Sequence, residues 1–137
     1  MEVSLRTVMD SFPVIEELFY KDIPAKASLR IRSLKRELHD YMHDYVDEED
    51  KLLKKHAELD ENGEFVRPEI LDENGENILD HNKVHILDWD KFEKEYKELL
   101  RLEVPITTSV IPFSTIKDVD ISGEKLDKII VFLDLES

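Results

Sequence analysis

The chain has 137 residues, of which 41% are hydrophobic and 38% charged, enough for one modest core in a single domain over residues 1–137. It contains no cysteine, which excludes disulfides, thiolate zinc sites and cysteine nucleophiles. No apolar run approaches the roughly 20 residues that span a bilayer, and the first twenty residues lack a signal-peptide pattern. We therefore expect a cytoplasmic protein.

The net charge of −14 is unevenly distributed along the chain. Residues 37–82 carry 16 acidic and 4 basic groups, whereas residues 1–36 carry 5 acidic and 7 basic groups. The resulting negative field repels phosphate backbones and anionic membranes, which disfavours direct binding of nucleic acid or membrane. A basic protein surface is the partner that fits this charge, and a solvated face that confers only solubility is the common alternative.

The amide content is also low. The sequence has no glutamine and 4 asparagines beside many Glu, Lys and Asp residues. Few thermolabile residues and many charges are typical of proteins from hot environments, although chance produces the same pattern in a short chain.

The N-terminal segment is predicted to form two short helical pieces. The first has an apolar side, and Pro13, following Ser11, fits the first helical position of the second. Pro24 ends that piece.

A long helix is predicted next, because apolar residues recur at alternating four- and three-residue steps and no Gly or Pro interrupts residues 25–62. The residues on this face are Ala27, Ile31, Leu34, Leu38, Tyr41 and Tyr45. Asn62-Gly63 is the predicted end. The first third of the helix is basic and the remainder acidic, which opposes the helix dipole, so we expect a contact to explain this polarity.

The sequence DENGE occurs at 60–64 and again at 72–76. Each Asn-Gly is a strong turn signal, and short apolar runs surround them, so a small antiparallel hairpin or meander is predicted. Calcium binding does not fit, because the glycine comes at the fourth position instead of the sixth.

Two further helices are predicted. Asp88 or Asp90 caps one that runs along Phe92 and Leu99, with Trp89 as an anchor at its start. A strand-like run at 107–113 is broken by Pro112, and a last helix starts at residues 122–124, with Leu126, Ile129, Ile130 and Leu133 facing inward. The predicted fold class is α+β, with one long amphipathic helix and shorter helices packed on a small antiparallel β-sheet.

Few residues suggest chemistry. His39 and His43 lie four apart, with Asp47 extending the row, and His81 and His85 repeat the spacing. Such pairs can bind a divalent ion, but there is no HExxH motif and no thiolate. No nucleophile motif or phosphate-binding glycine loop is present. We therefore expect no metal, no cofactor and no enzymatic activity.

The order of the pieces resembles a family of small acidic phage-encoded proteins, mostly of unassigned function. The resemblance lies in residues 21–26 (KDIPAK), 34–59, 60–63 (DENG), 92–100 (FEKEYKELL), 103–106 (EVPI) and 121–122. Within that family, the chain resembles an early protein of Thermus phages that binds host RNA polymerase at the β-subunit flap and the C-terminal region of the σ factor. The resemblance implies inhibition of promoters that need the −35 element, and antitermination.

The partner-binding candidates are therefore the acidic residues of the long helix and three aromatic anchors. The acidic residues are Asp44, Asp47, Glu48, Glu49 and Asp50, and the aromatic residues are Tyr45, Phe65 and Trp89. A basic σ surface would pair with the acidic residues and the aromatic residues would supply affinity, although core burial is the alternative for each ring. Two other functions remain open: a counter-defence or DNA-mimic protein that binds a basic surface, and a phage structural or assembly component.

Overall fold

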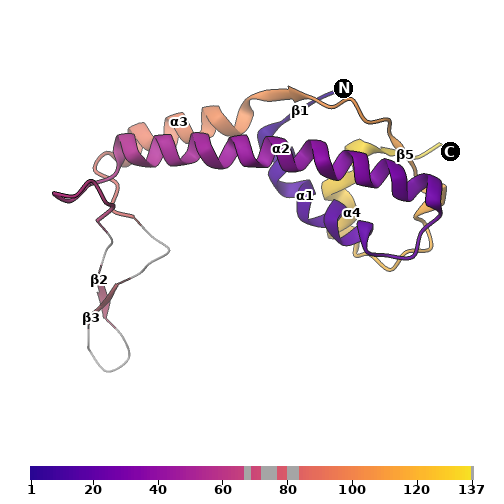
Figure 1. The fold of residues 1–137 in the computed structure, drawn as a ribbon, viewed down its shortest axis with the longest axis horizontal. Helices are drawn as coiled ribbons and strands as arrows, with labels where there is room; N and C mark the ends of the chain where they lie inside the picture. The colour runs from indigo at the N-terminus through magenta and orange to yellow at the C-terminus, as the bar shows by residue number, and fades with distance from the viewer. Residues whose placement is uncertain (67–68, 72–76, 80–83, 137) are drawn as a thin grey trace. The chain divides into compact units, whose positions relative to one another are not determined.

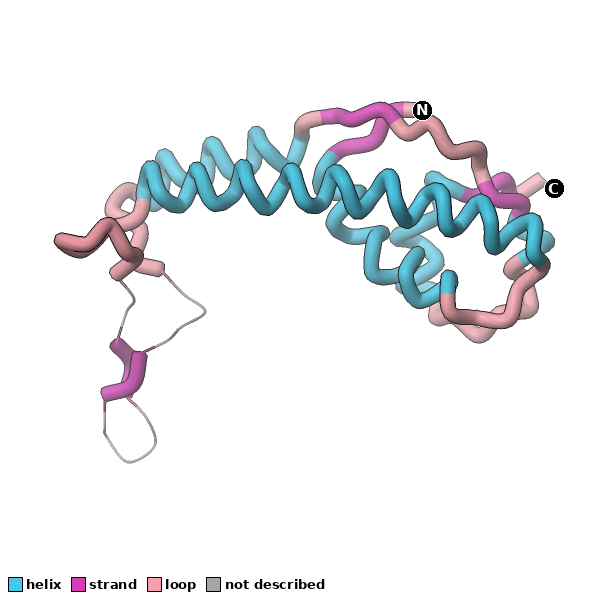
Figure 2. The backbone as a smooth tube through the Cα atoms, viewed as in Figure 1, coloured by secondary structure: helices cyan, strands magenta, loops and turns pink. Residues whose placement is uncertain are grey.

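The computed structural model describes residues 1–66, 69–71, 77–79 and 84–136. Its helices (Figure 1) are α1 (Leu5–Phe19), α2 (Ala25–His56), α3 (Trp89–Arg101) and α4 (Gly123–Ile129), with 3-10 turns at Phe113–Thr115 and Ile130–Phe132. The described strands form three pairs (Figure 2): β1 (Glu2–Ser4) with β4 (Glu103–Pro105), β2 (Glu69–Leu71) with β3 (Asn77–Leu79), and β5 (Ile111–Pro112) with β6 (Leu133–Asp134). The first two pairs are antiparallel and the third is parallel. The predicted α+β class is confirmed.

The chain divides into two compact units. Residues 1–45 and 100–137 form one, here called the terminal unit, and residues 46–99 form the other, the middle unit. The core of the terminal unit is apolar, and its fully buried side chains include Val8, Ile15, Leu18, Ile31, Leu34, Leu38, Ile111, Ile116, Ile129 and Phe132. They come from α1, the first half of α2 and the C-terminal segment, so distant parts of the chain share one core.

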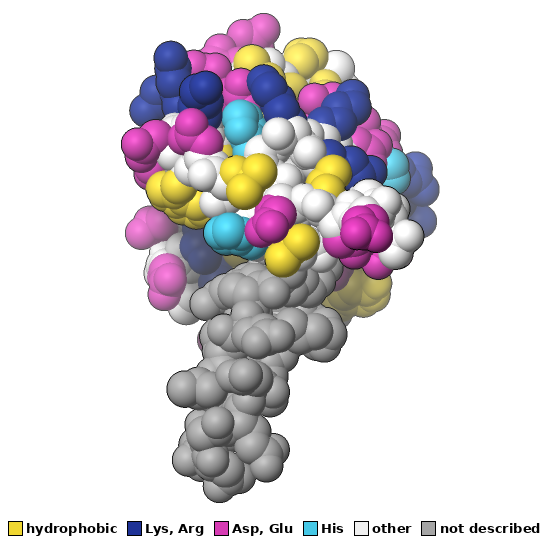
Figure 3. Space-filling view, turned by 90° about the vertical axis from the view of Figure 1, so that its left-hand side faces the viewer, with side chains coloured by type: hydrophobic (Ala, Val, Ile, Leu, Met, Phe, Trp, Pro, Cys, Tyr) yellow, Lys and Arg dark blue, Asp and Glu magenta, His cyan; other side chains and the backbone are white. Residues whose placement is uncertain are grey.

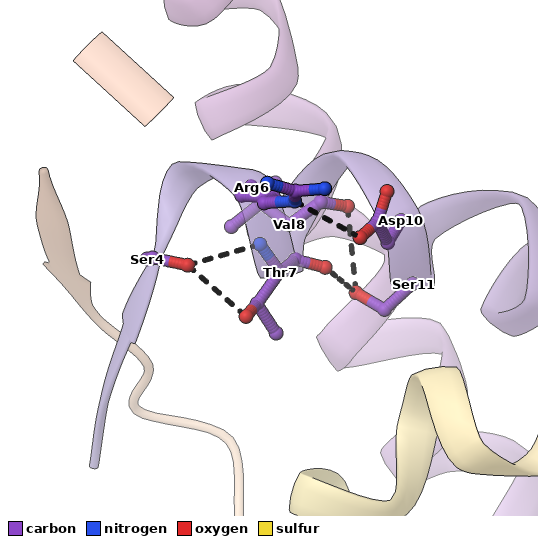
Figure 4. Close-up of polar contacts among 6 residues, drawn as sticks. All are labelled: Ser4, Arg6, Thr7, Val8, Asp10 and Ser11. Carbon is purple, nitrogen blue, oxygen red and sulfur yellow. Dashed lines mark hydrogen bonds and ion pairs between the residues drawn. The ribbon is translucent and has the colours of Figure 1, made fainter. Parts of the chain in front are cut away.

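One continuous helix, α1, replaces the two predicted pieces, and Pro13 lies inside it. Ser4 caps the helix by accepting a hydrogen bond from the backbone N–H of Thr7 at 3.1 Å, and the Ser11 hydroxyl donates to the Thr7 carbonyl at 2.6 Å (Figure 4). The prediction of a break at Pro13 was wrong because the apolar face of α1 continues past it into the core. That burial outweighs the roughly 3 kcal/mol that an internal proline costs.

The second helix ends at His56, not at Asn62-Gly63 as predicted. After His56 the backbone is extended, because its hydrogen-bonding groups pair with other segments. Glu58 N–H donates to the His85 carbonyl at 2.8 Å, and Val66 N–H donates to the Glu58 carbonyl at 2.9 Å. These non-local bonds satisfy the backbone in place of another helical turn.

The first DENG segment forms a turn, as predicted. The Asp60 carboxylate accepts the N–H groups of Asn62 and Glu64 at 2.8 and 3.0 Å, and Gly63 has a φ of 78°, which favours glycine. The second copy, at 72–76, lies outside the described residues. The two described strands beside it, β2 and β3, pair antiparallel, as the hairpin prediction requires.

The predicted strand at 107–113 is reduced to Ile111–Pro112. The physical reason is that the N–H groups of Thr107 and Thr108 donate to the Glu37 carboxylate on α2, at 2.8 and 2.6 Å, instead of to a neighbouring strand. Arg30 donates to the Val110 carbonyl of this segment at 3.0 Å, and Tyr41 donates to the Pro105 carbonyl just before it at 2.7 Å. Positions 30, 37 and 41 share one side of α2, which thereby anchors an irregular segment.

The last two helices keep their predicted caps. The Asp88 carboxylate accepts Lys91 N–H at 3.2 Å before α3, and Ser122 accepts Lys125 N–H at 3.2 Å before α4. The final helix is shorter than predicted: Ile130 is 45% exposed in a 3-10 turn, and Leu133 is buried in β6.

Candidate functional site

The acidic stretch of α2 lies on the helix surface. Asp44, Asp47 and Glu48 are exposed, and Glu49 and Asp50 are half-buried. Part of this charge is neutralised within the helix, because Lys51 lies 3.0 Å from Glu48 and Lys54 lies 2.8 Å from Asp50. On the face drawn in Figure 3, acidic side chains are likewise interspersed with lysines and arginines. Acidic and basic side chains are therefore mixed on that face, and the acidic ones form no unbroken patch there.

The three aromatic candidates have different surroundings. Tyr45 is only 4% exposed, Phe65 is half-buried, and Trp89 is 58% exposed. The Trp89 ring lies 5.6 Å from that of Phe92, which is buried in α3. Of the three, Trp89 alone presents most of its surface to solvent. The nearby Leu87, which sequence analysis did not single out, is 67% exposed.

A charged cluster that sequence analysis missed joins α2 to α3 inside the middle unit. One oxygen of the Glu95 carboxylate lies 2.7 Å from Lys55 Nζ, and the other lies 2.5 Å from His56 Nε2. The His56 side chain is 8% exposed, and its ring meets the Phe92 ring edge-on at 6.2 Å. The hydrogen bonds from Lys55 and then His56 hold the pKa of Glu95 below its ordinary value of 4.5.

This cluster borders an open pocket of about 450 Å³ that is lined by Lys55, His56, Leu87, Asp88, Lys91 and Glu95. Both oxygens of Glu95 already accept hydrogen bonds, and its lowered pKa keeps it ionised. Such a carboxylate is a poor proton acceptor, so we interpret Glu95 as a clamp between two helices. No sequence signal would have found the cluster, because His56 and Glu95 are 39 positions apart.

The histidine pairs do not assemble into a metal site in the part of the chain that the structure describes, where no group of three or more metal-ligating side chains occurs. His39 and His43 are exposed on α2, and the His39 ring lies 5.9 Å from that of Phe12. His85 binds the Glu58 carboxylate at 2.6 Å. His81 lies outside the described residues.

No family model, curated protein or solved structure matches this chain. Among the described residues, no helix combines the length and the apolar character needed to cross a membrane.

Proposed function

We propose that the protein binds a basic protein surface through its middle unit, and that this surface belongs to bacterial RNA polymerase, at the β-subunit flap and the C-terminal region of the σ factor. Binding there would inhibit promoters that depend on the −35 element and favour antitermination. The choice of polymerase follows the resemblance of the sequence to phage-encoded proteins. The choice of a basic surface follows the charge.

The observation that carries the proposal is the charge of the middle unit combined with its exposed apolar side chains. Residues 46–99 have 18 acidic and 8 basic groups, a net charge of −10, against −4 for the rest of the chain. Leu87 and Trp89, 67% and 58% exposed, lie two positions apart in this unit. Apolar anchors within a charged rim are typical of protein interfaces, where the rim sets orientation and association rate.

The proposal gives α2 the role of a long amphipathic helix that carries acidic groups on its solvent face. A σ region that recognises −35 DNA needs basic side chains to meet phosphates. An acidic helix would compete with DNA for those side chains. This action requires binding and no catalytic chemistry.

The test measures binding of the full chain to purified Thermus RNA polymerase, with and without σ, at two salt concentrations. The variant Asp47→Lys/Glu48→Lys, on exposed positions of the middle unit, should weaken binding by at least about tenfold and flatten its salt dependence. The matched control is Asp118→Lys/Asp120→Lys, which changes the net charge equally on exposed positions of the terminal unit.

A second pair of variants tests the apolar part. Trp89→Ala should lower affinity by about tenfold or more, because exposed aromatic side chains are frequent hot spots. Leu135→Ala, which truncates a side chain with the same 58% exposure in the terminal unit, should leave affinity unchanged. Absence of polymerase binding by the unmodified chain would refute the function. Equal binding by the acidic variant and its control would refute the electrostatic argument.

A further inference from the structure

A second pocket lies wholly within the terminal unit, where the end of α1 meets the first half of α2. It is open, has a volume of about 520 Å³, and is lined by Phe19, Arg32, Lys35, Arg36, His39 and Asp40. This volume is in the range of small-molecule sites. With His39 neutral, the lining carries a local charge of +2 in a chain whose total is −14.

Aromatic rings hold two of these cations. The rings of Phe19 and Tyr20 meet edge-on, with centroids 5.0 Å apart and planes at 79°. Lys35 Nζ lies 4.5 Å from the Phe19 centroid and 5.4 Å from the Tyr20 centroid, and Arg32 Cζ lies 5.3 Å from the Phe19 centroid. The ring faces therefore position positive charge without neutralising it.

Asp40 lines the same pocket, but within the described ranges no carboxylate lies within 4.0 Å of the Arg32, Lys35 or Arg36 cations. Other cations of the chain, such as Lys117 and Lys128, also form no ion pair there, but these three line one pocket. Acidic residues outnumber basic ones by 33 to 19, so partners are abundant. The gathering of three cations around one pocket, with no carboxylate in ion-pair contact, is the observation that points to an anionic ligand.

The stability of α2 does not explain why these three cations lie together either. They lie beyond the first turn of α2, the turn within which the helix dipole acts on side-chain charges, so the dipole does not explain their position. Arg32 and Arg36 are exposed, and Arg32 lies over the ring of Phe19. Adjacent basic groups repel each other, and an anion that binds all three relieves that repulsion.

The residues in and beside the pocket favour one kind of anion. Several cations close together favour a ligand with more than one phosphate, because guanidinium groups bind phosphate oxygens in pairs. Tyr20 is not part of the lining, but its ring lies 5.4 Å from Lys35 Nζ and the residue is 75% exposed, so it offers a ring surface beside the cations on which a base stacks. A long nucleic acid would meet the negative field of the whole chain, whereas a small ligand responds to charges within a Debye length of about 10 Å.

We propose that this pocket binds a nucleoside polyphosphate. Arg32, Lys35 and Arg36 contact the phosphates, and the base lies against Tyr20. This site is separate from the proposed polymerase-binding surface, and its test uses no partner protein.

Titration calorimetry on the full chain, with ATP and tripolyphosphate as probes, tests the proposal. ATP should bind more tightly than tripolyphosphate by about 5- to 100-fold, the effect of one base stacked on an aromatic ring. Tyr20→Ala should remove this difference and leave tripolyphosphate binding unchanged. Arg32→Glu/Arg36→Glu should weaken both ligands at least about tenfold.

The matched control is Lys117→Glu/Lys128→Glu, an equal charge change on exposed lysines of the same unit that do not line the pocket. Arg32→Gln/Arg36→Gln, with its melting temperature recorded, separates lost binding from lost folding. Failure of ATP to bind at millimolar concentration overturns the proposal. So does an equal loss of binding in the pocket variant and the control, or equal affinity for ATP and tripolyphosphate.

Discussion

The Glu37 carboxylate provides the sharpest stability test, because one side chain holds an irregular segment of the terminal unit to α2. Its Oε2 atom accepts Thr107 N–H at 2.8 Å and its Oε1 atom accepts Thr108 N–H at 2.6 Å. The Thr108 hydroxyl also donates to Oε1. The isosteric change Glu37→Gln replaces one accepting oxygen with an NH₂ group, which faces a backbone N–H as donor against donor.

The expected cost follows from these contacts. A hydrogen bond to a charged group contributes about 1.5–3 kcal/mol, and Glu37 is half-buried, so water compensates part of its loss. We therefore expect Glu37→Gln to lower the free energy of unfolding by about 1.5–2 kcal/mol. For a chain of this size that corresponds to a fall in melting temperature of roughly 5–8 °C.

The pH dependence gives a second measurement. Burial raises the pKa of Glu37, but the hydrogen bonds from Thr107 and Thr108 outweigh it, so the pKa lies below its ordinary value of 4.5. A lowered folded-state pKa gives stability that is fully present above the unfolded value and lost as pH falls through the folded value. The melting-temperature gap between the unmodified protein and Glu37→Gln should therefore be constant near neutral pH and shrink as pH falls below 4.5 and through the lowered pKa of Glu37 in the folded protein.

Thermal unfolding followed by circular dichroism from pH 3 to pH 7 measures both effects. The control is Glu16→Gln, an exposed carboxylate on α1, which should shift the melting temperature by less than about 2 °C. The reasoning is refuted if Glu37→Gln and Glu16→Gln have the same melting temperature at pH 7. It is also refuted if the melting temperature of Glu37→Gln lies as far below that of the unmodified protein at pH 3 as at pH 7.

Three further variants test other parts of the structure. Pro13→Ala should raise the free energy of unfolding by about 1–3 kcal/mol in urea denaturation. An internal proline costs a helix about 3 kcal/mol, and it offsets up to about 1 kcal/mol of this by restricting the unfolded chain. A destabilised variant would contradict the continuous α1. Gly63→Ala should destabilise by about 1 kcal/mol in the same assay because its φ is 78°, and no other atom would touch the new methyl group. Hydrogen bonds from Lys55 and His56 lower the pKa of Glu95, so the thermal-stability advantage of the unmodified protein over Glu95→Gln should be full at neutral pH. That advantage should decline as pH falls below 4.5 and through the lowered folded-state pKa, and a deficit that grows in acid would exclude this role.

The features predicted correctly from sequence depend on neighbours along the chain. Ser122 and Asp88 cap helices because their side chains reach an N–H three residues ahead. Asn62-Gly63 forms a turn because glycine adopts a positive φ. The buried positions Ile31, Leu34 and Leu38 follow from helical periodicity.

The predictions that were wrong concern places where segments distant in the sequence provide the hydrogen-bond partners of the backbone. Residues 107–113 have strand-forming side chains, but Glu37, 70 positions away, accepts the N–H groups of Thr107 and Thr108. Residues 57–62 have helical composition, but α2 ends at His56 because the backbone of residues 56–60 bonds to Glu64, Val66, His85 and Leu87. Propensity is a weak preference per residue, and non-local contacts override it.

The properties of the candidate sites likewise divide into those that the sequence determines and those that depend on tertiary structure. The sequence by itself determined the acidic excess of the middle unit, the absence of thiol chemistry and the basic first third of α2, because these properties need only residue identity and order. Tertiary structure alone decided that Tyr45 is buried while Trp89 is exposed, that His56 meets Glu95, and that the cations of α2 lie beside Phe19. Each of these outcomes depends on which surfaces pack together, and packing is a property of the whole folded chain.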